Sequence, residues 1–369
     1  MYWIILFILF VFTCIEISNK RINRTYFFIS YILLTILIVF RQGQGTDYYN
    51  YQYIYESVAQ TSSLAGLSLI YHCEPGYLFV NYIATRLGVS YLLFAAIFAL
   101  ITMFVYYPFF YKWCKCSMIP LFSFYALFFL IYPFSVIREG LVLGIFVSYL
   151  LPLMEKRKYV IYILITILSA TFHMSALICL LFPFVYRLRI PNIYLFCIFI
   201  VSCILILLNF DISKFLPQFS SYEGRSDNFF FAAIARVVFL MPIFMVPDRV
   251  YRGSPNLLHM RNVLFTGFLI YTMFSGNDIT SSRLGVYCRM LEYIFLTALM
   301  YSNSLIKLPR QLLICYITIA IFFFGKNIND FINQGEYKNC NIFTYPYLSL
   351  FDSPDKIMYY RGDFDERFI

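Results

Sequence analysis

Long apolar runs, separated by short polar stretches, make up most of the chain. An α-helix needs about 20 predominantly apolar residues to cross the hydrocarbon core of a bilayer. Most of the runs approach or reach that length, so the pattern predicts an all-α polytopic membrane protein with about 12 transmembrane segments, within a range of about 10 to 13. The predicted segments cover residues 1–17, 25–40, 90–111, 117–134, 136–154, 159–173, 174–187, 192–210, 229–247, 262–276, 286–301 and 311–324.

Basic residues gather in short clusters between these segments, and cytoplasmic loops of membrane proteins carry an excess of Lys and Arg. All the clusters lie on the cytoplasmic side at once if both termini lie outside, and the segments above satisfy that condition. The clusters fall within residues 20–24, 112–115, 156–158, 187–189, 249–261 and 307–310. The outer face then carries the loops 41–89 and 211–228 and the tail 325–369, all within one integral membrane domain, 1–369.

Two places do not fit a row of straight spans. The stretch 76–88 is too short and contains Arg86, so we expect an interfacial helix on the outer face. The two segments that flank His173 are each shorter than the length of about 20 residues that a span needs. One continuous span over 159–187 would move the basic cluster 249–261 outside. We therefore expect a broken or re-entrant helical hairpin with His173 at the bend.

Composition supports a membrane protein. Of the 369 residues, 61% are hydrophobic and 13% are charged, and the mean hydropathy is +0.74. A soluble domain of this length cannot bury so much apolar surface. The cytoplasmic clusters account for the net charge of +9, so this charge does not indicate a nucleic-acid partner. The first segment lacks a basic region before it and a small-residue cleavage site after it, and we expect a retained helix rather than a signal peptide.

Several arginines lie at the ends of apolar segments on the predicted outer side, away from the basic clusters. They are Arg41, Arg138, Arg225 and Arg283. A cation near the bilayer costs about 2.5–3.5 kcal/mol on insertion scales, so it usually has a partner or a function. Here we favour the binding of anionic groups, most plausibly phosphates. Arg138 opens a predicted helix, where the guanidinium and the helix dipole act together on an anion. The alternative is an Arg–carboxylate pair that fixes the helix end.

The first outer loop offers further candidates. Gly43 and Gly45 let backbone N–H groups approach an anion closely. Asp47 is suited to positioning a sugar hydroxyl or holding an arginine. Tyrosines follow at once, among them Tyr48 and Tyr51, and their flat faces suit stacking on carbohydrate. The alternative for each tyrosine is the aromatic belt that membrane proteins place at the bilayer interface.

His173 is the candidate for acid–base chemistry. A histidine in an apolar helix is more often a hydrogen-bonded core residue, but a position at a helix break on the same face as the arginines also favours a function. The sequence has no zinc spacing, P-loop, dinucleotide fingerprint or nucleophile elbow. The pair Asp363-Phe-Asp365 is a weak metal signal. We therefore predict no metal site and no cofactor.

Five short motifs, taken in order, resemble one known family. They are Gly45-Thr-Asp47-Tyr-x-x-Tyr51 after an arginine, Glu74-Pro-Gly-Tyr77, Ile137-Arg138-Glu139 before a helix, Phe172-His173-x-Ser175-Ala176 and Arg283-x-x-x-Tyr287. Together they resemble the EpsG-like branch of the Wzy polysaccharide polymerases, which includes the O-antigen polymerases. The resemblance extends to about residue 350. The chain departs from it at Glu139, where this branch commonly carries Gln, so the role of that side chain is open.

The resemblance implies a glycosyltransferase of the bacterial inner membrane with a GT-C-like fold. Such an enzyme transfers a growing glycan from undecaprenyl pyrophosphate to a new lipid-linked repeat unit on the periplasmic side. The expected partners are these two lipid-linked glycans and membrane lipid, with a chain-length regulator and a flippase as further candidates. The implied pyrophosphate ligands are Arg138, Arg225, Arg283, Arg41 and Arg289. The implied base is His173, followed by Glu74 and Asp47, and the implied substrate contacts are Tyr48, Tyr51, Tyr77 and Tyr287.

Other functions share some of these features. A flippase or transporter of lipid-linked glycan also needs outer cations, but it is expected to show pseudo-repeats and polar residues through the midplane, and neither is visible. An O-antigen ligase uses the same donor but usually has one large outer loop. A membrane acyltransferase needs a histidine near its active face but no set of outer arginines. The sequence therefore favours the polymerase and leaves the flippase and the ligase as alternatives.

Overall fold

Helices form almost all of the regular structure in the computed structural model. It describes residues 1–61, 66, 73–208, 210, 212, 229–295, 310–335 and 337–361. Within these ranges there is no β-strand, and only one isolated bridge joins Arg41 to Ser349. The prediction of an all-α protein is confirmed.

Two compact units divide the chain, and each is described by itself. The first unit contains Met1–Ser148, Leu168–Met174 and Ile317–Ile369, and the second contains Tyr149–Ile167 and Ser175–Tyr316. The expectation of one integral membrane domain stays a prediction.

The helices follow one another with short connections. Up to residue 155 they are α1 (Tyr2–Asn19), α2 (Arg24–Val39), α3 (Tyr48–Gln60), α4 (Pro75–Arg86), α5 (Tyr91–Lys112), α6 (Met118–Phe124), the π-helical turn η2 (Tyr125–Phe129), α7 (Ile137–Ile145), the π-helical turn η3 (Phe146–Leu150) and α8 (Leu151–Glu155). Beyond it they are α9 (Tyr159–Ala170), the 3₁₀ helix η4 (Met174–Leu181), α10 (Phe182–Tyr186), α11 (Asn192–Leu207), α12 (Phe229–Met245), α13 (Asp248–Gly253), α14 (Pro255–Met273), α15 (Asp278–Arg289), α17 (Arg310–Gln334) and α18 (Pro354–Arg361).

Polar side chains fix several of these boundaries. The Asn23 side chain accepts hydrogen bonds from the first free backbone N–H groups of α2 and caps that helix. Glu16 is buried near the end of α1 and accepts a hydrogen bond from the Ser117 hydroxyl at 2.6 Å and one from the Met118 N–H at 3.0 Å. Because the positive end of a helix dipole favours a carboxylate, Glu16 ties α1 to the start of α6.

Some of the helices are long and apolar enough to cross a membrane. Among the described residues these are Tyr2–Asn19, Tyr91–Lys112, Ile137–Glu155 and Leu313–Gln334. Shorter apolar helices cover Arg24–Val39, Met118–Phe129, Tyr159–Ala170, Met174–Tyr186 and Asn192–Leu207. The protein is thus an all-helical membrane protein, and the number of about 12 spans stays a prediction.

Two predicted boundaries are wrong. The outer tail was expected to begin at residue 325, but α17 continues for several turns beyond it. Lys326 and Asp330, one helical turn apart, form an ion pair at 2.6 Å, and such pairs stabilise exposed helical turns. The predicted segment 286–301 is not one continuous helix, because α15 ends at Arg289 and the backbone then turns.

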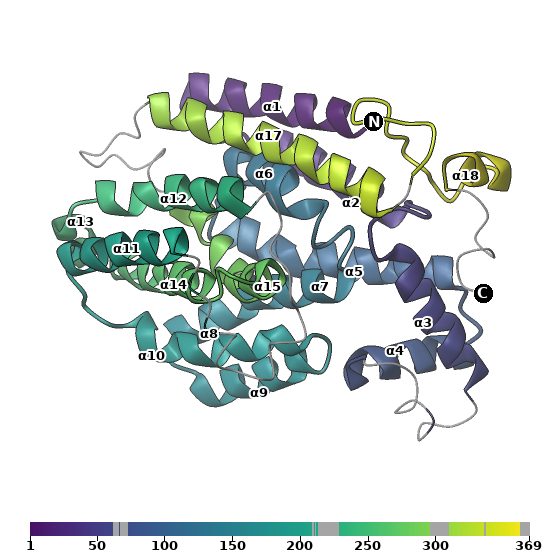
Figure 1. Cartoon of the computed structure of the whole chain (residues 1–369), viewed down its shortest axis with the longest axis horizontal. Coiled ribbons are helices and arrows are strands. Elements are labelled where there is room, and N and C mark those ends of the chain that lie inside the picture. Colours follow the sequence, from purple (N-terminus) through teal and green to yellow (C-terminus); the bar gives the residue numbers. More distant parts are fainter. Residues whose placement is uncertain are drawn as a thin grey trace. The chain divides into compact units, whose positions relative to one another are not determined.

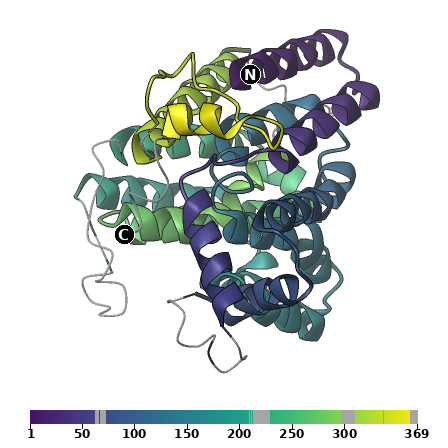
Figure 2. The same ribbon diagram turned by 90° about the vertical axis from the view of Figure 1, so that its right-hand side faces the viewer.

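The first unit brings the two ends of the chain together. Helices α1 and α17 run side by side (Figure 1), and Trp3 contacts Phe324 edge-on at 5.1 Å between ring centroids. The segment after α17 returns to the N-terminus (Figure 2), where the Trp3 indole N–H donates to the Ile342 carbonyl at 2.9 Å. The same segment holds the loop after α2, since the Gln44 amide donates to the Pro346 carbonyl at 2.6 Å. The predicted first outer loop and outer tail therefore touch, as expected for segments on one side of a membrane.

The chain breaks where the hairpin was predicted to bend. Helix α9 ends at Ala170, and η4 begins at Met174, directly after His173. The Tyr162 hydroxyl on the first limb donates to the Cys179 carbonyl on the second at 2.6 Å. A broken helical hairpin with His173 at its bend is confirmed, and its re-entrant course in a membrane stays a prediction.

Candidate active site

Arg138 lies in the first turn of α7 and is held from several sides. Its guanidinium lies 5.5 Å from the ring centroids of both Tyr51 and Tyr77, and it forms an ion pair with Glu74. Its Nη1 also contacts Cys73 Sγ at 3.2 Å. The Arg138 side chain is 18% exposed. The guanidinium is therefore oriented in advance at a helix N-terminus while part of it stays accessible to a ligand.

Glu74 connects this arginine to the bend of the hairpin. It is the residue before Pro75, where α4 begins. One carboxylate oxygen pairs with Arg138, and the other accepts a hydrogen bond from the Met174 N–H at 3.2 Å and lies 3.3 Å from His173 Nδ1. Burial alone would raise the pKa of the Glu74 carboxyl, but His173 and Arg138 together lower that pKa to about 2. Glu74 is therefore a carboxylate at neutral pH.

His173 lies between two carboxylates and is almost fully buried. Its Nδ1 faces Glu74 at 3.3 Å, and its Nε2 lies 3.6 Å from an oxygen of Glu139. Burial alone would lower the pKa of the imidazole, but Glu139 and Glu74 raise that pKa above its usual value. This arrangement favours the imidazolium form, since opposite charges within a few ångströms stabilise the protonated ring.

A glycine allows α4 to pack directly against this bend. The Gly76 N–H donates to the Thr171 carbonyl at 2.8 Å. A Cβ added at Gly76 would lie 2.2 Å from the Thr171 hydroxyl oxygen, closer than van der Waals contact allows. The sequence Glu74-Pro-Gly thus fixes the approach of two segments that are distant in the chain, and it places Glu74 beside His173.

Glu139 is the site residue whose role the sequence left open. Its side chain is 1% exposed and faces His173. One of its oxygens, Oε1, has no hydrogen-bond partner among the described residues. A buried acceptor without a partner is costly, so the site has spare hydrogen-bonding capacity. The sequence signal was adjacency to Arg138, but the partner His173 lies on another segment.

The predicted substrate tyrosines of the first unit are buried. Tyr48 and Tyr51 are 3% exposed and Tyr77 is 0% exposed. Tyr51 and Tyr77 contact each other edge-on and face the Arg138 guanidinium. In this arrangement the rings support the arginine, and cation–π contacts of this kind favour a fixed guanidinium. Their stacking on a sugar stays a prediction.

Arg41 and Asp47 have structural surroundings of their own. The Arg41 side chain is 5% exposed, and its guanidinium lies over the rings of Phe134 at 4.7 Å and Tyr48 at 5.9 Å. The Arg41 backbone bridges to Ser349 of the C-terminal segment. Asp47 occupies the N-cap position of α3. Arg41 therefore holds the first loop against neighbouring elements, and pyrophosphate binding by it stays a prediction.

The remaining candidates belong to the second unit, on or near α15. The buried Tyr287 hydroxyl and the Ser175 hydroxyl share a hydrogen bond at 2.8 Å, which joins two of the motifs. Arg289 Nε lies 3.9 Å from a carboxylate oxygen of Glu292. Arg283 is half-buried on the same helix. The shared pyrophosphate site of these arginines with Arg138 stays a prediction.

Three of the residues considered from the sequence lie outside the described ranges: Arg225, Asp363 and Asp365. Among the residues that the structure does describe, no group of three or more His, Cys, Asp or Glu side chains is placed to hold a metal ion.

A model of the EpsG family matches residues 24–349, which is most of the 369-residue chain. The chain belongs to the EpsG family. Family membership suggests a membrane protein with a polysaccharide-polymerase type of function. No curated protein and no solved structure gives a match. The region that matches the EpsG family includes all the candidate site residues, from Arg41 to Arg289.

Proposed function

We propose that this EpsG-family protein polymerises lipid-linked oligosaccharide repeat units. It transfers the growing glycan from undecaprenyl pyrophosphate to a new repeat unit on the same carrier, at the periplasmic side of a bacterial inner membrane. The product is an O-antigen or another exopolysaccharide. The observation that carries the proposal is the cluster of Arg138, Glu74, His173 and Glu139, which combines an anion-binding cation with acid–base groups.

Arg138 is the group that we assign to the donor pyrophosphate. Arginine binds phosphate oxygens in a bidentate manner, and the N-terminus of α7 adds the positive end of the helix dipole. In the ligand-free chain the Glu74 carboxylate pairs with this guanidinium. A pyrophosphate carries more negative charge than one carboxylate, so it displaces Glu74 from Arg138. Arg225, Arg283 and Arg289 are proposed as further ligands of the same group.

The reaction forms one bond and breaks one. A hydroxyl oxygen of the acceptor sugar attacks the anomeric carbon of the donor, the bond from that carbon to the pyrophosphate oxygen breaks, and its electron pair leaves with the pyrophosphate. Cations at the leaving group stabilise the charge that develops there. The acceptor hydroxyl must also lose a proton to a base.

Glu74 is better suited than His173 to take this proton. The two carboxylates beside His173 favour a ring that is already protonated. Glu74 is a weak base while Arg138 and His173 both stabilise its anion, but loss of the Arg138 contact to the donor raises its basicity. The donor thereby activates the base as it binds. His173 holds Glu74 in position, and Glu139 holds His173.

A glycan ladder from cells tests the function. We expect an Arg138→Ala strain to accumulate lipid-linked glycan as single repeats, whereas Arg86→Ala, which removes an arginine from the end of α4, leaves the ladder unchanged. Loss of a ligase would instead leave no glycan on lipid A–core, and loss of a flippase would leave the repeat units inside. A normal distribution of chain lengths in Arg138→Ala cells that contain the protein at wild-type amount would overturn the proposal.

A further inference from the structure

The second unit contains a basic cavity far in sequence from the candidate active-site motifs. It has a volume of about 670 Å³, and its lining includes Arg157, Arg187, Arg189 and Arg252, together with His259 and Asp248. The arginines come from three of the basic clusters that the charge pattern places on the cytoplasmic side. Their convergence on one cavity agrees with that topology.

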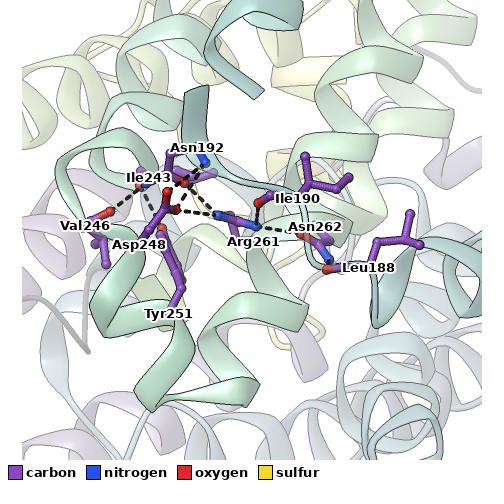
Figure 3. A network of polar contacts seen from close by, with 9 residues as sticks. All are labelled: Leu188, Ile190, Asn192, Ile243, Val246, Asp248, Tyr251, Arg261 and Asn262. Atoms are coloured by element: carbon purple, nitrogen blue, oxygen red, sulfur yellow. Dashed lines mark hydrogen bonds and ion pairs between the residues drawn. The ribbon is translucent and has the colours of Figure 1, made fainter. Parts of the chain in front are cut away.

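A buried polar network forms the wall of the cavity (Figure 3). Arg261 is 0% exposed, and its guanidinium donates to the Asn192 side chain at 2.6 Å and to the Ile190 carbonyl. It also lies 3.7 Å from Asp248 and over the Tyr251 ring at 4.5 Å. Because Arg261 balances Asp248, the acidic residue of the lining does not cancel the other arginines. The lining as a whole is cationic.

The arginines at the rim are free to meet a ligand. Arg157, Arg189 and Arg252 are exposed, and none of them forms an ion pair among the described residues. Arg187 is half-buried and donates to the backbone carbonyls of Met154 and Glu155, which fixes its position. Its Nε has no hydrogen-bond partner within the described ranges.

His259 points to a ligand independently of the arginines. It lines the cavity, is only 9% exposed, and its Nδ1 has no hydrogen-bond partner in the described part of the chain. A buried ring nitrogen without a partner is costly, and a bound anion or its hydroxyl group would satisfy it. The cavity therefore offers both charge and a buried polar atom.

We propose that this cavity binds a phosphate-bearing anion at the cytoplasmic side of the membrane. Guanidinium groups match the geometry of phosphate oxygens. The source is the headgroup of an anionic phospholipid or a soluble phosphate compound. Large exposed apolar side chains next to the cavity wall, such as Phe184 at 79%, Leu188 at 44% and Ile193 at 62%, favour the lipid, because they place acyl chains beside the arginines. This inference does not depend on the polymerase function.

Binding of defined probes to the purified full-length protein tests the proposal. The probes are cardiolipin, phosphatidylcholine as the zwitterionic control, and inorganic pyrophosphate, each measured in neutral detergent by native mass spectrometry and by titration. The test variant is Arg189→Gln/Arg252→Gln, which leaves the Arg261 network intact. The matched control is Lys20→Gln/Arg21→Gln, which removes the same charge from exposed residues of another basic cluster.

We expect cardiolipin binding to weaken about fivefold for each arginine removed, so about 25-fold in the double variant, and to change little in the control. If pyrophosphate shows this pattern and cardiolipin does not, the source is a soluble phosphate compound. Equal binding of both probes by the wild type, the double variant and the control overturns the proposal. Since the readout contains no lipid-linked glycan, this result is separate from the outcome for the polymerase.

Discussion

The most specific consequence of the site geometry concerns Glu139→Gln. This substitution keeps the size of the side chain and removes one of the two negative charges beside His173. The lost charge lies 3.6 Å from Nε2, while Glu74 remains 3.3 Å from Nδ1. The imidazole therefore keeps one anionic partner, and we expect the site to stay folded with a lower pKa of His173.

The size of the shift follows from the distance and the burial. Two unit charges 3.6 Å apart interact by about 4–5 kcal/mol at an effective dielectric constant of about 20. Desolvation of the carboxylate and relaxation around it offset part of this energy. A neighbouring opposite charge typically shifts a pKa by about 1–3 units. We expect the pKa of His173 to fall by an amount in that range.

Histidine-selective NMR measures the shift directly. The chain has three histidines, so ¹⁵N-labelled imidazole signals can be assigned by replacing one histidine at a time. The same variants can be assayed for polymer formation against pH. If protonated His173 holds Glu74 in position, activity falls as pH rises through the pKa of His173. In Glu139→Gln that alkaline decline moves to lower pH by the shift seen in the NMR titration.

The control is Glu56→Gln, which removes an exposed carboxylate from α3 and is expected to change neither curve. An unchanged pKa of His173 in Glu139→Gln would refute the ion-pair geometry. A wild-type activity that rises, instead of falling, through the pKa of His173 would show that the neutral ring is the active form. In that case the proton acceptor would be His173 rather than Glu74.

Three further predictions concern packing and donor binding. Gly76→Ala brings a Cβ within 2.2 Å of a threonine hydroxyl on the neighbouring bend, so it should destabilise the protein by about 1–3 kcal/mol in thermal unfolding, whereas Gly253→Ala, with open space around it, should not; equal melting temperatures would refute the close approach. Arg138→Lys keeps the charge but loses the bidentate fork, so KM for the lipid-linked donor should rise about tenfold with normal folding; an unchanged KM would argue against donor binding there. Tyr162→Phe removes the hydrogen bond to Cys179 and should cost about 1 kcal/mol of unfolding free energy, and no loss would mean that this bond does not hold the hairpin together.

The sequence was informative where the signal is local. Segment lengths on either side of His173 were too short for straight spans, and that argument predicted the break which the structure contains. Hydropathy was misleading at the end of α17, because it detects apolar residues rather than helix. The ion pair of Lys326 with Asp330 lets the helix continue after its apolar part ends.

The assembly of the site depends on contacts between distant segments. Glu74, Arg138 and His173 were each candidates, but their sequence positions do not reveal which atoms face one another. Glu139 shows the limit most clearly, since its role depends on a histidine on a different segment. A single sequence gives no measure of such a pairing, whereas packing of α4 against the bend at Gly76 brings the partners together.

The most direct test of the proposed function is polymer synthesis by the purified full-length protein from one defined undecaprenyl-pyrophosphate-linked repeat unit. The reaction is run with a metal chelator present, and products are separated by length. We predict a ladder of multiple repeats from the wild type in chelator, and only single repeats from Arg138→Ala. A wild-type protein that binds the lipid-linked unit but extends it neither with nor without metal would contradict the proposed polymerase.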